Sequence, residues 1–227
     1  MKIIAVSNPK GGVGKTTTTI NLAASLAILD KKVLIIEMDP NGTLSTGLGL
    51  ETGSIKSGLF GLILGTIEVT EAIQHHKLKN LHIIPCNVNS NEQETRFASI
   101  LRSKISLKTK IDDIISKWNL DYDFILMDTP PILNEITISA LYAAKSVLIP
   151  LQCSYYAINV VERLIQMVQR IRNGGNPELK IEGILLNFYE KNTRFSRKAL
   201  SEAKLLFKDL MLNTIIPKNA TDRKSVV

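Results

Sequence analysis

A run of glycines and lysines near the start of the chain has the composition of a phosphate-binding loop. It consists of Lys10, Gly11, Gly12, Val13, Gly14, Lys15, Thr16 and Thr17. The glycines let the backbone curl without a side-chain penalty, so that its N–H groups can converge on a polyphosphate. Lys15 is expected to neutralise the β and γ phosphates of a nucleotide, and the Thr16 hydroxyl is expected to hold Mg²⁺. The alternative is a glycine-rich turn that carries a lysine by chance.

The segments on either side of this loop predict the elements that would hold it. Residues 3–6 are an apolar run typical of a buried strand. Apolar residues then recur at helical spacing through residues 16–29. The loop is therefore expected between a strand and a helix, where the positive end of the helix faces the phosphates.

Two aspartates stand where further strands are expected to end. Asp39 follows the apolar residues 33–36, and Asp128 follows the apolar residues 124–127. In an open parallel sheet, ligands bind in the crevice beyond the carboxyl ends of the strands. Asp128 is expected to support the Mg²⁺ shell with Thr16, and Asp39 to orient and deprotonate the attacking water. Taken singly, either aspartate could also cap a helix or belong to a turn.

The phosphate loop resembles the deviant Walker A box of the ParA/MinD family. The strict pattern G-x-x-x-x-G-K-[ST] fails only at its first glycine, where Pro9 stands, and Lys10 follows it. The family also includes the nitrogenase iron protein and arsenite-pump ATPases. The resemblance implies ATP and Mg²⁺ as cofactors, and a homodimer formed with ATP in which Lys10 reaches the nucleotide of the partner subunit. Lys10, Lys15 and Asp39 are thus the expected catalytic residues.

Other positions match the family with small departures. The second box, Glu37 to Asn41, has Asn41 where a glutamine is usual, and Ser154 stands where many members carry glutamate. Asn187 resembles the strand-terminal asparagine that recognises adenine, and Pro217 resembles the loop that covers the other face of the base. An asparagine at a strand end is also a common turn residue.

The order of expected elements predicts one α/β domain over residues 1–227. Strands are expected near residues 2–7, 33–38, 81–85, 124–128, 145–150, 181–187 and 212–216, with helices between most of them. This alternation gives a P-loop NTPase fold with a mostly parallel, roughly seven-stranded sheet covered by helices on both faces. Residues 57–64 and 70–74 are expected to form short helices. The chain ends soon after the last expected strand, where the resembled family continues into one or two helices, which indicates a short or truncated C-terminus.

Composition argues against several classes of protein. Cys86 and Cys153 are the only cysteines and form no C-x-x-C pair, which argues against an iron–sulfur reductase. We find no signal peptide, and no apolar run approaches the roughly 18 residues that a membrane span needs. A cytoplasmic, nucleoid-associated protein is expected.

The positive charge is concentrated in the last third of the chain. Residues 1–162 hold fifteen Lys and Arg against fifteen Asp and Glu, whereas residues 163–227 hold thirteen against six. An excess of this kind suits sequence-independent contact with DNA phosphates. A solvated helix face is the alternative. The expected DNA contacts are Lys191, Arg194, Arg197, Lys198 and Lys218.

Together these features predict a Mg²⁺-dependent ATPase that switches between monomer and dimer and acts in plasmid or chromosome partitioning. The resemblance adds a ParB-like centromere-binding protein that stimulates a weak basal turnover. A MinD-like membrane-associated ATPase is one alternative, although the final residues 221–227 are polar and too few for an amphipathic helix. A nucleotide-binding scaffold that does not hydrolyse ATP is the other.

Overall fold

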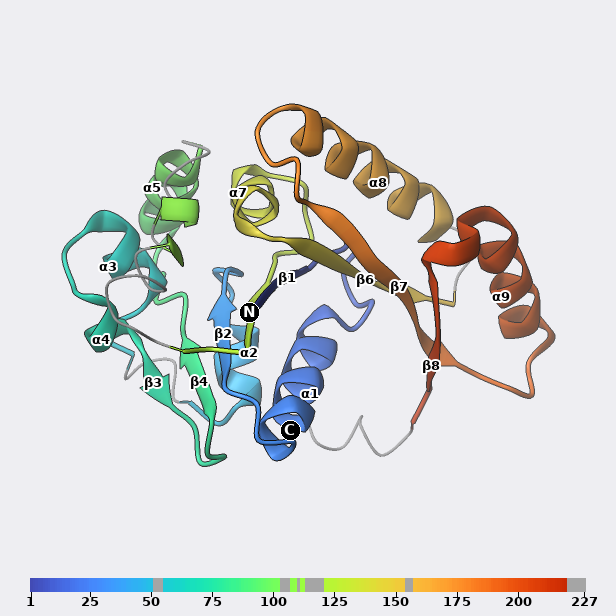
Figure 1. Ribbon diagram of the computed structural model, residues 1–227, viewed down its shortest axis with the longest axis horizontal. Helices are drawn as coiled ribbons and strands as arrows, with labels where there is room; N and C mark the ends of the chain where they lie inside the picture. Colours follow the sequence, from blue (N-terminus) through green and yellow to red (C-terminus); the bar gives the residue numbers. More distant parts are fainter. Residues whose placement is uncertain (51–54, 103–106, 110, 113–120, 154–156, 220–227) are drawn as a thin grey trace.

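The computed structural model describes residues 1–50, 55–102, 107–109, 111–112, 121–153 and 157–219 (Figure 1). Ser154 and residues 221–227, on which two of the sequence interpretations depend, lie outside these ranges.

One sheet runs through the described part of the molecule, with eight strands in the order β3-β4-β2-β5-β1-β6-β7-β8. All neighbours pair in parallel except β3 and β4, which are antiparallel. The predicted α/β fold with a mostly parallel sheet is therefore confirmed. The strands are β1 (Lys2–Val6), β2 (Val33–Glu37), β3 (Gln74–His75), β4 (Leu81–Ile84), β5 (Phe124–Asp128), β6 (Ser146–Gln152), β7 (Lys180–Tyr189) and β8 (Met211–Pro217).

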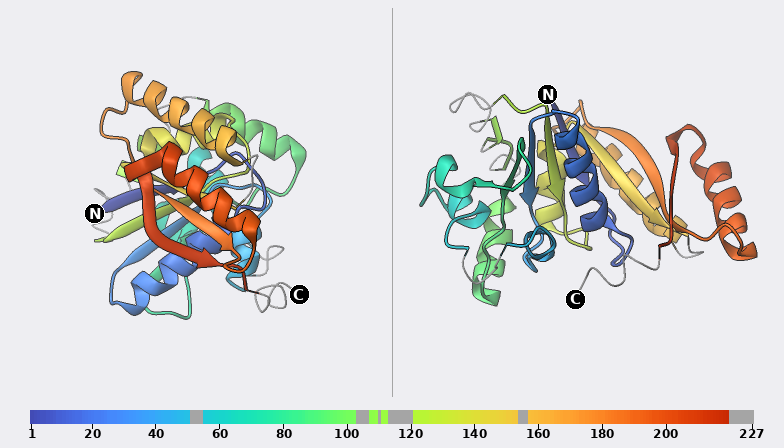
Figure 2. Two further views of the ribbon diagram at one scale, coloured as in Figure 1. Left: turned by 90° about the vertical axis from the view of Figure 1, so that its right-hand side faces the viewer. Right: turned by 90° about the horizontal axis from the view of Figure 1, so that it is seen from below.

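Helices cover both faces of the sheet. Helices α1 (Lys15–Ile28) and α2 (Thr43–Gly47) pack on one face. The opposite face carries α3 (Leu59–Leu64), α4 (Val69–Ala72), α5 (Asn91–Leu101), α7 (Glu135–Ala143), α8 (Ala157–Asn173) and α9 (Arg194–Phe207). Figure 2 shows α1 and α8 on opposite sides of the central strands. In the described ranges, every helix is too short or too polar to cross a bilayer.

Successive side chains of each central strand point to opposite faces of the sheet, so the protein has two separate hydrophobic cores. In β1, Ile3 and Ala5 belong to the core under α7 and α8, whereas Ile4 and Val6 belong to the core under α1. Successive side chains of a strand point to opposite faces, so a strand covered on both sides must be apolar throughout. This is why the central strands read as continuous apolar runs in the sequence.

The region between β2 and β4 differs in part from expectation. The helix expected over residues 57–64 is α3 (Leu59–Leu64), and the one expected over residues 70–74 is the shorter α4 (Val69–Ala72). Gln74 instead opens β3, where it lies opposite Ile83 of β4. The backbone bonds of residues 74 and 75 are therefore made with a neighbouring strand, an interaction that local helical spacing cannot reveal.

Helix α3 starts directly on the carboxyl end of β4. The Leu59 N–H donates to Pro85 O at 2.7 Å, and the Phe60 N–H donates to Asn87 Oδ1 at 3.0 Å. A Cβ on Gly58 would lie only 2.3 Å from Pro85 O. Only glycine at position 58 therefore permits this close approach of two backbones.

We expect Gly58→Ala to lower the free energy of unfolding by about 1–3 kcal/mol, because the added methyl meets a backbone carbonyl that has no room to move. Urea denaturation measures the change. Gly61→Ala is the matched control within the same helix, since its Cβ would meet the flexible end of Ile67 at 3.1 Å and alanine favours a helix. Equal stability of the Gly58→Ala variant and the wild type would contradict the prediction.

Candidate active site

The phosphate loop takes the path that its glycines predicted. It connects β1 to α1, and Gly12 and Gly14 adopt left-handed φ angles of 71° and 87°. Gly14 also caps α1, and a Cβ there would lie 2.8 Å from Nδ2 of Asn187. The first N–H groups of α1 have no partner within the helix, so the loop presents a positive helix end to solvent at this edge of the sheet.

Asn8 fixes the entrance of the loop, a role that its sequence context does not predict. Its side chain is fully buried, with Nδ2 donating to Pro150 O at 2.7 Å and Oδ1 accepting from the Lys10 N–H at 3.0 Å. The residue thus ties the loop to β6. No local pattern indicates this, because Pro150 is far away in the sequence.

Lys15 is held inside the loop rather than in solvent. Its residue is 7% exposed, and Nζ donates to Lys10 O at 3.2 Å. Burial lowers the pKa of Lys15, and the negative charges of Asp128 and Asp39 oppose that shift. A buried ammonium is costly unless an anion compensates it, and Asp128 and Asp39 supply that compensation here.

Asp128 lies at the end of β5 against two hydroxyls of α1. Thr16 Oγ1 donates to its Oδ2 at 2.8 Å, and Thr19 Oγ1 donates to its Oδ1 at 3.2 Å. Burial raises the pKa of Asp128 to about 7, while these hydrogen bonds and the Lys15 charge act in the opposite direction. Thr19 was not predicted; its signal was the i, i+3 spacing from Thr16, which places both hydroxyls on one face of the helix.

Asp39 lies in the turn that follows β2, next to the same carboxyl edge. Its Oδ1 accepts from both the N–H and the side-chain Nδ2 of Asn41, at 3.0 and 2.9 Å. The Met38 N–H donates to Asp128 O at 2.9 Å, so this turn begins beside Asp128. Asn41, which stands where glutamine is usual, thus has a structural task in orienting Asp39.

Asn187 and Pro217 lie on the neighbouring strands β7 and β8. Asn187 is buried beside the phosphate loop, where Nδ2 donates to Val13 O at 2.9 Å and to Thr18 Oγ1 at 3.2 Å. Its Oδ1 is buried and has no partner among the described residues. That orphaned acceptor is compatible with a base amino group. Pro217 ends β8 and is exposed, with Tyr189 as its strand neighbour.

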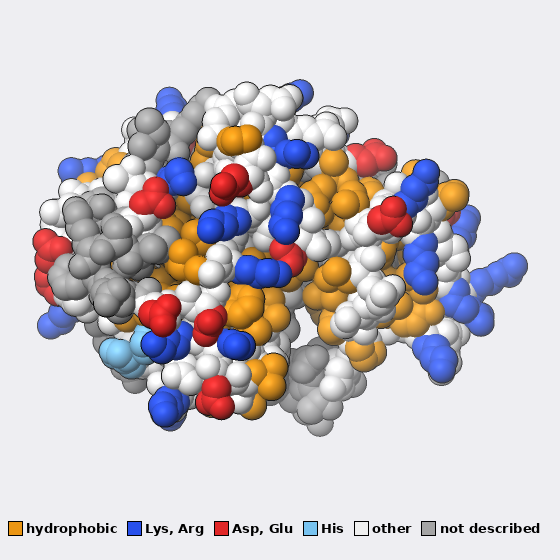
Figure 3. Space-filling view, viewed as in Figure 1, with side chains coloured by type: hydrophobic (Ala, Val, Ile, Leu, Met, Phe, Trp, Pro, Cys, Tyr) orange, Lys and Arg blue, Asp and Glu red, His pale blue; other side chains and the backbone are white. Residues whose placement is uncertain are grey.

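The five expected DNA contacts gather at one end of the molecule, away from the buried carboxylates. Lys191 lies between β7 and α9, Lys218 directly follows β8, and the other three lie in α9. All of them are exposed, and Figure 3 shows basic side chains over the α9 end. Lys198 pairs with Glu202 at 3.8 Å, and Lys218 pairs with Glu190. These two partners reduce the local excess of charge.

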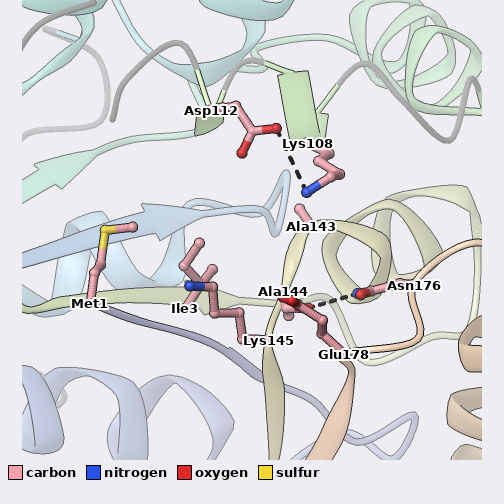
Figure 4. Close-up of a pocket in the computed structure, with 9 residues that line it drawn as sticks. All are labelled: Met1, Ile3, Lys108, Asp112, Ala143, Ala144, Lys145, Asn176 and Glu178. Atoms are coloured by element: carbon pink, nitrogen blue, oxygen red, sulfur yellow. Dashed lines mark hydrogen bonds and ion pairs between the residues drawn. The ribbon is translucent and has the colours of Figure 1, made fainter. Parts of the chain in front are cut away.

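A hollow of about 250 Å³ lies at the opposite edge of the sheet, near the amino ends of β1 and β6 (Figure 4). Lys108 there pairs with Asp112 at 3.6 Å, and Asn176 Nδ2 donates to Ala144 O at 2.7 Å. These polar groups bind each other or the backbone. The residues of the phosphate site all lie at the carboxyl edge instead.

Comparison with known proteins agrees with this geometry. A model of a family described as an AAA domain matches residues 1–181. The chain is 36% identical to the sporulation initiation inhibitor protein Soj of Bacillus subtilis over 218 residues, which cover 96% of this chain and 85% of Soj. It is also 36% identical to the chromosome partitioning protein ParA of Myxococcus xanthus, covering 96% of this chain and 76% of ParA.

A solved structure adds a ligand to the comparison. The cobyrinic acid a,c-diamide synthase of Mycobacterium smegmatis, with a bound ATP analogue and magnesium, superimposes with a TM-score of 0.86. The two chains are 27% identical, and the match covers 100% of this chain and 90% of the synthase. The expectation of ATP and Mg²⁺ is thereby confirmed at the level of homologous structures.

The titration of Asp128 gives a test in protein free of nucleotide and Mg²⁺. Its pKa is raised to about 7 in the folded state, from about 3.9 in an unfolded chain. The folded state therefore binds the proton more tightly, so the stabilising contribution is complete below about pH 4 and is lost as the pH rises through about 7.

We expect Asp128→Asn, which cannot titrate, to gain stability relative to the wild type between about pH 4 and about pH 7. The gain should approach at most about 4 kcal/mol, at about 1.4 kcal/mol for each unit of the shift. Urea denaturation of both proteins at several pH values measures the difference. A difference that does not change with pH would show that the carboxyl is ionised throughout.

Proposed function

The chain belongs to the ParA/Soj family of P-loop ATPases, and from that premise we propose that it is a Mg²⁺-dependent ATPase that partitions plasmid or chromosomal DNA as an ATP-switched dimer. The observation that carries the proposal is the convergence of Lys15, Asp39 and Asp128 at the carboxyl edge of β1, β2 and β5. Each charge acts on the pKa of another across this edge. A turn lysine placed by chance would not be buried between two carboxylates.

The phosphate loop binds and orients the nucleotide. Its N–H groups and the N-terminus of α1 are donors for phosphate oxygens, and the Lys15 ammonium neutralises the β and γ phosphates. The orphaned Oδ1 of Asn187 accepts from the amino group of adenine, and Pro217 covers the other face of the base. Burial strengthens the interactions of Lys15 and Asn187 because water is excluded.

Thr16 and Asp128 fit the metal that such a reaction needs. Mg²⁺, when bound, neutralises charge that develops on the phosphate oxygens. The Thr16 hydroxyl would be its direct ligand, and Asp128 would hold that hydroxyl as it does in the structure. Asp39 orients the attacking water and accepts its proton, and the two hydrogen bonds from Asn41 fix the carboxylate for that task.

Dimerisation and DNA binding complete the proposed cycle. Lys10 reaches the phosphates of the partner subunit's nucleotide, so that a dimer forms only with ATP. The dimer joins two copies of the basic α9 end, which holds nucleoid DNA in the cytoplasm through phosphate contacts. A ParB-like protein stimulates hydrolysis and thereby releases the DNA.

The two lysines of the loop should separate nucleotide binding from dimerisation. We expect Lys15→Ala to weaken ATP binding by at least about 2 kcal/mol, because a buried charge-assisted contact is lost. Lys10→Ala should bind ATP nearly as the wild type does but form no ATP-dependent dimer and show no turnover. Calorimetry gives the affinity, and light scattering gives the mass. Unchanged affinity in the first variant, or a dimer in the second, would contradict the assigned role.

The basic residues of the α9 end should be needed for DNA binding and not for chemistry. We expect replacement of Arg194, Arg197 and Lys198 by Glu to abolish ATP-dependent binding to DNA of any sequence while leaving basal ATPase activity intact. In the wild type, each neutralised phosphate contributes roughly 0.9 to the slope of log affinity against log salt, and the variant should show a flatter slope.

A matched control makes the same change in net charge at the other end of the sheet, by replacing three other basic residues. Lys31, Lys77 and Lys79 are exposed and lie around β2 and the β3–β4 turn. Their replacement by Glu should change DNA affinity far less than the α9 substitutions. Salt-titrated binding that falls equally in both variants would show a general effect of charge, and a solvated helix face would then be the better interpretation of the α9 end.

A further inference from the structure

Glu37, the first acid of the second box, is buried and accepts four hydrogen bonds, although the proposed chemistry assigns it no role. It ends β2 with 1% exposure, two residues before Asp39. We propose that Glu37 is a positioning residue that fixes the turn carrying Asp39. This inference rests on the proposed function, because it concerns the same ATPase site.

Both carboxylate oxygens of Glu37 accept hydrogen bonds. Oε1 accepts from the Leu44 and Ser45 N–H groups, at 2.9 and 3.0 Å. Oε2 accepts from Ser45 Oγ at 2.5 Å and from the Cys86 N–H at 3.2 Å. A carboxylate in a dry interior is tolerated when donors surround it, and four donors do so here.

These bonds fix both ends of the turn between β2 and α2. At one end, the chain leaves β2 beside Asp128. At the other end, the first residues of α2 are held on Glu37. Within the turn, the Gly42 N–H donates to Asp39 O at 3.1 Å, and Asn41 holds Oδ1 of Asp39. The direction of the Asp39 carboxylate therefore depends on where Glu37 places α2.

The fourth donor connects the same turn to a second element. Cys86 follows β4, and its carbonyl accepts from the Phe60 N–H of α3 at 3.2 Å. Glu37 is thus the junction between α2, the end of β4 and, through Cys86, the start of α3. Displacement of any of these elements would therefore move the turn that carries Asp39.

Glu37 acts through Asp39 and not on the nucleotide itself. All four of its donors come from the protein, and its burial keeps it from solvent. Glutamine at this position would place its NH₂ group on the Oε2 side, where Ser45 Oγ can rotate to accept from it but the Cys86 N–H loses its acceptor. Aspartate would keep two acceptors on a shorter side chain. The two substitutions therefore perturb the turn to different degrees.

The test measures turnover, ATP affinity and amide exchange on the full chain. We expect Glu37→Gln to lower kcat by about tenfold or more, with ATP affinity by calorimetry within about twofold of the wild type. Hydrogen exchange should accelerate at the amides of Asn41, Leu44 and Ser45, a local change that exchange rates at β1 and β5 would not share. Glu37→Asp should lose less turnover than Glu37→Gln. Ser45→Ala, which removes one donor of four, should remain close to the wild type.

Each outcome supports or overturns the inference. Wild-type turnover in Glu37→Gln, together with loss of turnover in Asp39→Asn, would overturn the role of Glu37 and leave the proposed ATPase intact. No ATP turnover by the wild-type protein, alone or with DNA, would overturn both. If Glu37→Gln does not fold, Glu37→Asp decides: a reduced kcat at unchanged affinity supports the inference, and a kcat equal to that of the wild type overturns it.

Discussion

The contact between Asp128 and the hydroxyls of α1 is the interaction on which the rest of the site depends. Thr16 and Thr19 donate to both oxygens of a carboxylate that is fully buried at the end of β5. Burial raises the pKa of this carboxyl to about 7, and these donors and the nearby Lys15 keep the pKa from rising further. The same contact ties the first turn of α1 to the centre of the sheet. Phosphate binding, metal binding and catalysis therefore share one anchor.

The order of the strands brings the remaining groups to that anchor. The sheet places β5 between β1 and β2, and all three are parallel. Their carboxyl ends consequently lie side by side, although Asp39 and Asp128 are far apart in the sequence. Right-handed crossovers put α1 on one face, where its N-terminus opens toward both acids. An order that moved β2 or β5 away from β1 would separate the phosphate loop from the acids.

Sequence predicted the parts of this arrangement that follow from local pattern. Continuous apolar runs identified the central strands, and the glycines of the loop predicted its left-handed turns at Gly12 and Gly14. Strand β3 could not be predicted, because two residues are too few to show the alternation of apolar and polar residues that is typical of a strand. They become a strand only by pairing with β4 in the folded protein. Asn8 and Glu37 owe their roles to partners on other elements, Pro150 and Cys86, and no spacing in the chain reveals such partners. The DNA contacts and the adenine site stay predictions, because the first rest only on the positive charge of the residues and the second only on the residue types at positions 187 and 217.

The path between the nucleotide site and the basic end of the molecule is short. Asn187 of β7 bonds the phosphate loop at Val13, and the next residue, Phe188, has a left-handed φ of 59° at the point where the register between β7 and β8 shifts. Left-handed backbone at a bulky aromatic residue costs free energy, so surrounding contacts must hold it. Three residues beyond Glu190, Thr193 caps α9 by accepting from the Ser196 N–H. A displacement of Asn187 by a bound base would therefore act on one strand end, and that strand end leads directly into the helix that carries Arg194 and Arg197.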